Sequence, residues 1–332
     1  MKNLPVFVLT AVCLAVSPVL AAESEPVLRT LPCRAADAQS LQEWQTAART
    51  TLADLLHMDD QIAGHGLDAT GQSSVPLNAV VLETTAGNGY SRRVIEIDAR
   101  PDRRIKVVVT VPANAAPRGT PAVVCIHGHG GNRNIVYDPA SPYRGFATIL
   151  AEKGYVTLST DVGQHEVQDR QRTLMGERLW DLMRVVDLAV SQPEVDARRM
   201  GCAGLSLGGE MAMWLGAMDT RMRATVSSGF LTTMSNLRHG HCPCWDFPGL
   251  QQRYEFADIY SLISPRALQC QNGQLESLPG GFPVDLAQQA FAEIQRAYRA
   301  AERETAAELA VHPAGHVFDV AQGVAFLDTH LQ

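Results

Sequence analysis

This chain of 332 residues has few long apolar runs and no large excess of positive or negative charge. Beyond the first residues, no segment offers the roughly 18 uninterrupted apolar residues of a membrane-spanning helix, so we expect no span there. The formal net charge of −7 lacks the basic excess of proteins that bind nucleic acid, and we expect no such partner. The chain also has no internal repeat and no low-complexity tract, which excludes a repeat architecture.

The first 22 residues have the composition of a secretion signal. Lys2 supplies a positive start, residues 4–16 are apolar, and small residues follow up to Ala22. Cleavage after Ala21 or Ala22 predicts an exported protein, secreted or periplasmic, without a stable membrane anchor.

Cysteine is sparse as well. Three cysteines lie in apolar, strand-like runs, where a buried free thiol is the common state: Cys125, Cys202 and Cys270. Three others lie outside such runs: Cys33, Cys242 and Cys244. Because export permits disulfides, we expect one disulfide among the second three, with the pairing left open.

The hydrophobic pattern divides the chain into two parts with different expected secondary structure. A helix is expected at 38–57, then strands of period two at 79–83, 92–97 and 105–111, which favour antiparallel pairing. From residue 122 onward, apolar strands alternate with helices, which predicts a parallel sheet covered on both faces. The expected strands are 122–126, 155–159, 199–204, 224–227, 267–270 and 307–311, and the expected helices are 146–153, 179–190, 209–218, 284–301 and 320–331.

The fold class that follows is α/β, with a mostly parallel, doubly wound sheet and an N-terminal extension of helix and strands. We divide the chain into a signal at 1–22, the extension at 23–88 and a catalytic domain at 89–332. The long connection at 229–262 is expected to cover the pocket as a partial lid.

Residues 204–208 read Gly-Leu-Ser-Leu-Gly between an expected strand and an expected helix. A serine in such a tight turn projects its hydroxyl above the edge of the sheet, and small glycines are needed where the backbone is strained and closely packed. This context predicts a nucleophile elbow with Ser206 as the nucleophile.

A glycine-rich loop, His127-Gly-His-Gly-Gly131, directly follows the strand at 122–126. Its backbone N–H groups can turn toward a developing oxyanion, and the residue after the serine supplies a second donor. We therefore expect His129, Gly130 and Leu207 at the oxyanion hole.

The base and the acid are expected in loops after the last two strands. His316 lies in the loop before the final helix and is favoured as the base, whereas His312 lies nearer the strand and is expected to be structural. Glu276 is the favoured acid. Asp285 is the alternative, but the helix dipole alone explains an acidic residue at the start of a helix.

Two groups of histidine and cysteine suggest zinc. The segment His239-Gly-His-Cys-Pro-Cys244 is too compressed for its four side chains to surround one ion, and the pair His127 and His129 lacks matching further ligands. We therefore expect no metal and no cofactor, with a metal-dependent hydrolase kept as an alternative.

From Gly89 to the C-terminus the chain resembles the α/β-hydrolase esterases grouped as acetyl xylan esterase-like and dienelactone hydrolase-like proteins. The shared segments are Ile126-His-Gly-His-Gly-Gly, Gly204-Leu-Ser-Leu-Gly-Gly-Glu-Met-Ala, Cys242-Pro-Cys, Ile263-Ser-Pro-Arg-Ala-Leu and His312-Pro-Ala-Gly-His-Val-Phe. The resemblance implies Ser206 as nucleophile, His316 as base and the 127–131 loop at the oxyanion hole. Its usual acid is an Asp in a Gly-x-x-Asp run, where this chain has Glu276.

These features predict a serine carboxylesterase that acts on a carbohydrate ester or a small-molecule ester. A serine peptidase of the same fold and a non-catalytic binding protein are the alternatives. The identity of the substrate and the oligomeric state do not follow from the sequence, because pocket shape depends on how the extension and the insertion fold.

Overall fold

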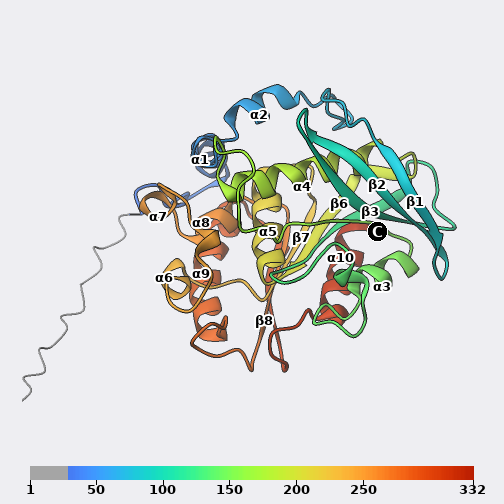
Figure 1. Ribbon diagram of the computed structural model, residues 1–332. Coiled ribbons are helices and arrows are strands. Elements are labelled where there is room, and N and C mark those ends of the chain that lie inside the picture. Colours follow the sequence, from blue (N-terminus) through green and yellow to red (C-terminus); the bar gives the residue numbers. More distant parts are fainter. Residues whose placement is uncertain (1–28) are drawn as a thin grey trace, which may run out of the picture.

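The computed structural model describes residues 29–332 and has a nine-stranded mixed sheet at its centre (Figure 1). The spatial order of the strands is β1-β2-β3-β5-β4-β6-β7-β8-β9. The predicted signal at 1–22 lies outside the described residues. The strands are β1 (Val80–Ala86), β2 (Tyr90–Arg100), β3 (Arg103–Pro112), β4 (Thr120–Ile126), β5 (Val156–Thr160), β6 (Val195–Leu205), β7 (Ala224–Ser228), β8 (Ala267–Gly273) and β9 (Ala307–His312).

The antiparallel end of the sheet comes from the segment with the period of two. Strands β1, β2 and β3 pair in antiparallel fashion, and β3 joins the rest of the sheet through antiparallel pairing with β5. In the C-terminal half of β2, only alternate residues are fully buried, such as Ile95 and Ile97. The antiparallel pairing expected there is confirmed, and β1 belongs to the same sheet as the strands after residue 89.

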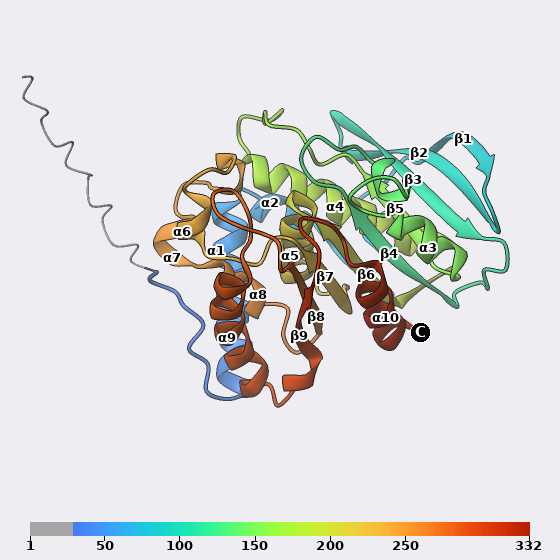
Figure 2. The ribbon, with the colours of Figure 1, turned by 90° about the horizontal axis from the view of Figure 1, so that it is seen from below.

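The strands from β5 to β9 pair in parallel, and helices cover both faces (Figure 2). Helices α3 and α10 pack on one face, while α4, α5, α8 and α9 pack on the other, as the α/β pattern predicts. The helices are α1 (Ala38–Leu55), α2 (Asp59–His65), α3 (Phe146–Glu152), α4 (Leu174–Ser191), α5 (Leu207–Met218), α6 (Met234–Leu237), α7 (Leu250–Arg253), α8 (Phe256–Ser261), α9 (Val284–Ala300) and α10 (Val320–Leu331).

The connection between β7 and β8 carries the short helices α6, α7 and α8. Its aromatic side chains are buried and pack onto the body of the protein, among them Phe230, Trp245, Phe247 and Tyr254. Phe230 and Trp245 also line the cavity described below. Across residues 29–332, none of the helices is both long enough and apolar enough to cross a membrane.

The expected disulfide is absent, because all six cysteines of the described part are free thiols. Cys33 packs beside Leu41 of α1 and Ala297 of α9, and its backbone N–H donates to Asp258. Cys242 and Cys244 instead lie beside histidines at the cavity described below. The prediction was wrong about Cys33 because lying outside a strand does not bring a thiol near a partner. Cys125, Cys202 and Cys270 are buried, as expected.

Candidate active site

The turn that holds Ser206 has the strained backbone of a nucleophile elbow. Ser206 stands between β6 and α5 with φ 65° and ψ −127°, a conformation that side chains other than glycine rarely adopt. Its backbone N–H donates to the carbonyl of Ser228 at 2.9 Å, which ties the turn to β7. A Cβ at Gly208 would stand 2.2 Å from the carbonyl oxygen of Ile126, so only glycine fits beside β4. Strand β4 and helix α5 can pack this closely because Gly208 has no side chain.

The imidazole of His316 is held from one side by a carboxylate. Its Nδ1 lies 2.8 Å from Oε1 of Glu276, whose side chain is only 3% exposed, while the imidazole itself is 40% exposed. The other carboxylate oxygen of Glu276 accepts the backbone N–H of Phe282 at 2.9 Å. The ring of Phe282 stacks on the imidazole, with 5.6 Å between the ring centres. Two contacts therefore hold His316, and a third holds the carboxylate that it contacts.

The loops that carry these two residues are joined through their backbones. The N–H of Gln274 donates to the carbonyl of His312 at 2.8 Å, and the N–H of Leu275 donates to that of Ala314 at 3.1 Å. Glu276 follows β8 and His316 follows β9, and these strands are parallel neighbours. The strand ends therefore bring the acid and the base together.

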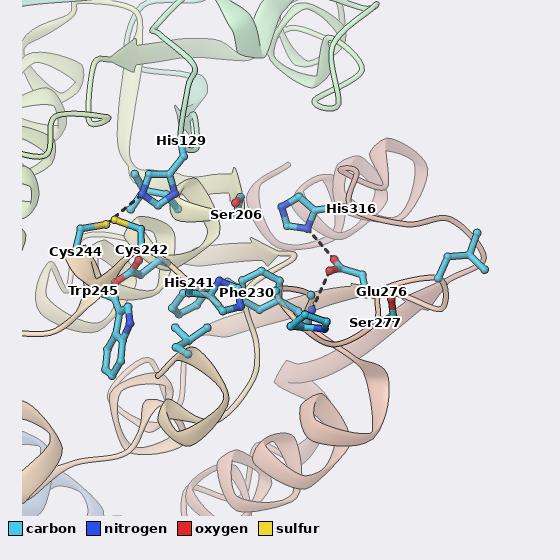
Figure 3. Close-up of a pocket in the computed structure, with 18 residues that line it drawn as sticks. His129, Ser206, Phe230, His241, Cys242, Cys244, Trp245, Glu276, Ser277 and His316 are labelled. Carbon is cyan, nitrogen blue, oxygen red and sulfur yellow. Dashed lines mark hydrogen bonds and ion pairs between the residues drawn. The ribbon is translucent and has the colours of Figure 1, made fainter. Parts of the chain in front are cut away.

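Ser206, His316 and Glu276 all line one cavity of about 460 Å³ (Figure 3). In Figure 3 the imidazole of His316 lies between the serine and the carboxylate. No hydrogen bond joins Ser206 Oγ to His316 among the described residues, and such bonds are often long before a substrate is bound. The walls are partly aromatic, with Phe230, Trp245 and Phe282. Sequence reasoning missed Phe282, because its loop carries no motif.

Of the three residues expected at the oxyanion hole, His129 and Leu207 line the cavity. Leu207 is the first residue of α5, so its N–H has no acceptor within the helix. The N–H of Gly128 is occupied, because it donates to the hydroxyl of Tyr143. Gly130 is exposed and lines a different hollow. The available donors are therefore those of His129 and Leu207.

The other histidine of this loop, His127, has a structural role. His127 is fully buried, and its Nε2 accepts the backbone N–H of Val162 at 3.0 Å, while Nδ1 lies 2.8 Å from the carbonyl of Gly128. This network assigns the neutral tautomer with its proton on Nδ1. Burial lowers the pKa of His127, which agrees with a neutral ring.

The alternative base and acid lie in other environments. His312 is buried at the end of β9 and does not line the cavity. Asp285 is exposed in the first turn of α9. The cavity wall also contains Glu210 of α5, a buried carboxyl whose pKa is raised to about 8 by burial.

The two groups of histidine and cysteine seen in the sequence meet in space. His129, from the pair His127 and His129, lies beside Cys242 and Cys244 of the 239–244 segment. His165, which the sequence analysis did not consider, completes the cluster. His239 and His241 do not belong to this cluster.

The mixed sheet, the strained serine turn and the histidine loop after the last strand define an α/β-hydrolase. Residues 105–233 match the model of the dienelactone hydrolase family. Over 172 residues, or 44% of this chain, it is 29% identical to a Bacillus subtilis protein named as a hydrolase, YtaP. The matched stretch covers 57% of the length of that relative.

Solved structures with the same fold are more distant in sequence. A Bacteroides fragilis protein named as an acetyl xylan esterase superposes with a TM-score of 0.65 at 17% identity, covering 86% of this chain and 80% of its own. A glucuronoyl esterase from Solibacter usitatus gives a TM-score of 0.66 at 17% identity, with 89% and 94% covered. At this identity the likeness establishes the α/β-hydrolase fold.

Proposed function

We propose that the protein hydrolyses carboxylic esters with Ser206 as nucleophile, His316 as base and Glu276 as the acid that orients the base. The observation that carries the proposal is the 2.8 Å contact between His316 Nδ1 and the buried carboxylate of Glu276, on the cavity wall that also holds Ser206. A carboxylate at Nδ1 keeps the proton there and leaves Nε2 free to accept the serine proton.

The reaction then runs in two halves. Ser206 Oγ attacks the ester carbonyl as its proton passes to Nε2 of His316, and the backbone N–H groups of His129 and Leu207 stabilise the oxyanion. Collapse of the tetrahedral intermediate breaks the bond to the alcohol, which leaves with the proton from Nε2. Water, deprotonated by the same nitrogen, then releases the acid and restores the serine.

The cavity favours a neutral, short acyl group. Among the described residues that line it, none is a lysine or an arginine, so none of them offers a permanent positive charge to a substrate carboxylate. Phe230, Trp245 and Phe282 offer apolar and stacking surface suited to a sugar or a small ring. Relatives of the same fold named as acetyl xylan esterase and glucuronoyl esterase support a carbohydrate ester.

An ester panel tests both parts of the proposal. Aryl acetate and acetylated xylo-oligosaccharide should be hydrolysed, a methyl ester of glucuronic acid more slowly, and Ser206→Ala should abolish all of these activities. Loss of the nucleophile typically costs several orders of magnitude in kcat. Hydrolysis of the acetyl esters by Ser206→Ala would contradict the mechanism, and a clear preference for the glucuronate ester would contradict the proposed preference for a short acyl group.

We also propose that the protein acts outside the cytoplasm, on the strength of the signal-like residues 1–22. N-terminal sequencing of the protein exported by its host should find a chain that begins at residue 22 or 23. A mature chain that still begins at Met1 would contradict export through this signal.

A further inference from the structure

Four side chains of metal-binding type, from three separate segments, meet beside the active-site cavity. His129 follows β4, His165 lies between β5 and α4, and Cys242 and Cys244 belong to the connection at 229–262. Each offers one ligand atom, and the four atoms all lie within 4.8 Å of one another. Nε2 of His129 is 3.1 Å from Sγ of Cys244, and Nδ1 of His165 is 3.5 Å from Sγ of Cys242.

The two N···S distances are close to the corresponding edge of a tetrahedral zinc site. Zn–N bonds of about 2.0–2.1 Å and Zn–S bonds of about 2.3 Å give an N···S edge of about 3.6 Å. We propose that His129, His165, Cys242 and Cys244 bind one Zn²⁺ ion. Two imidazoles and two thiolates select zinc over magnesium or calcium, which prefer oxygen ligands.

The surroundings are suited to two thiolates. The guanidinium of Arg178 lies beside Cys244, and its Nε and Nη1 are buried without a hydrogen-bond partner among the described residues. A metal-bound thiolate would accept from these donors, as groups around metal ligands commonly do. On binding, Cys242 and Cys244 each release a proton to solvent, and Zn²⁺ with two thiolates carries no net charge beside the buried arginine.

Four protein ligands complete the tetrahedron, so the proposed ion has no open position for water and acts as a structural clamp. It ties the glycine-rich loop, the segment before α4 and the 229–262 connection together. His129, Cys242 and Cys244 also line the cavity with Ser206, so the clamp sets the shape of the substrate pocket. The binding of zinc does not depend on the proposed ester hydrolysis, whereas its effect on the substrate pocket rests on that proposed function.

Zinc content tests the proposal without any activity assay. The untagged full chain, purified with a thiol reductant and no chelator, should retain about one Zn²⁺ per chain by mass spectrometry of the metal. Cys242→Ser and Cys244→Ser should each lower the retained zinc at least about tenfold. Two matched controls lie outside the cluster and should keep the full zinc content: Cys33→Ser, at a half-buried free thiol, and His239→Ala, in the same connection.

A second measurement on the unmutated protein covers the case in which a variant fails to fold. Replacement of zinc by Co²⁺ should give thiolate-to-cobalt charge-transfer absorption and the intense d–d bands of a tetrahedral site. Three results would overturn the proposal: unmutated protein without bound zinc and with only the spectrum of hydrated Co²⁺, zinc retained in both cysteine variants, or a Cys242–Cys244 disulfide in the reduced preparation.

Discussion

Replacing Glu276 by glutamine probes the contact on which the proposed mechanism depends. The carboxylate has two partners, Nδ1 of His316 and the backbone N–H of Phe282. Since that N–H can only donate, the glutamine oxygen must face Phe282 and its NH₂ group must face Nδ1. Nδ1 then becomes an acceptor and the proton moves to Nε2, the nitrogen that has to accept the proton of Ser206.

The size of the effect follows from this change of tautomer. In serine proteases, the amide in place of the triad acid lowers kcat about 10⁴-fold, or about 5 kcal/mol of transition-state stabilisation. We expect a similar loss in Glu276→Gln, with little change in KM, because the carboxylate acts on an imidazolium formed during the reaction. Both hydrogen bonds keep a partner, so the free energy of unfolding should change by only about 1 kcal/mol.

Steady-state kinetics on an aryl acetate, with thermal unfolding of the same samples, measures both quantities. Asp285→Asn is the matched control, because Asp285 is exposed at the start of α9 and contributes at most about 1 kcal/mol through the helix dipole. If Glu276→Gln keeps kcat within about tenfold of the unmutated enzyme, or if Asp285→Asn loses activity instead, the assignment of the acid is wrong.

Three further substitutions test the scaffold around the site. Tyr143→Phe leaves the buried N–H of Gly128 without its acceptor. The free energy of unfolding, measured by denaturant titration, should therefore fall by about 1–3 kcal/mol, and kcat should fall with it. Unchanged values for both would refute this role. Gly208→Ala places a Cβ 2.2 Å from a backbone oxygen, so it should lower the free energy of unfolding by about 1–3 kcal/mol or prevent folding. The control Gly64→Ala, at an uncrowded position on α2, should be neutral or stabilising. Equal unfolding midpoints for the two variants would count against the close packing. For Glu210, burial raises the pKa from 4.5 to about 8 against the opposing charge of Arg178, so its contribution to stability is full below pH 4.5 and is lost as the pH rises toward 8. Glu210→Gln should therefore gain in melting temperature relative to the unmutated protein across that range, and a constant difference would exclude the raised pKa.

The elements that sequence analysis predicted best are those defined by local pattern. Uninterrupted apolar strands are typically buried on both faces, so the parallel strands and their covering helices could be predicted from the order of apolar and helical segments. The tight turn at Ser206 could be predicted because its strained backbone requires glycines at fixed offsets, and the positions of the loops that carry Glu276 and His316 follow from the ends of neighbouring strands.

What sequence analysis missed depends on contacts between distant segments. The two groups of histidine and cysteine were considered separately. The segment 239–244 was too compressed to surround one ion, and the pair His127 and His129 lacked further ligands. They meet only because the 229–262 connection folds back over the loop of His129, and His165 carries no local signal at all. The incorrect disulfide has the same origin, since Cys33 packs against α1 and α9 rather than near the other two thiols.

The central claim is that Ser206 is the nucleophile, and a fluorophosphonate that forms a stable adduct tests it most directly. Peptide mapping after reaction should find one adduct per chain, on the peptide that contains Ser206. The adduct should be absent from Ser206→Ala and should form far more slowly in His316→Ala, because the serine then lacks its base. An adduct on another residue, or ester hydrolysis that continues in the presence of excess phosphonate without any adduct, would contradict the account.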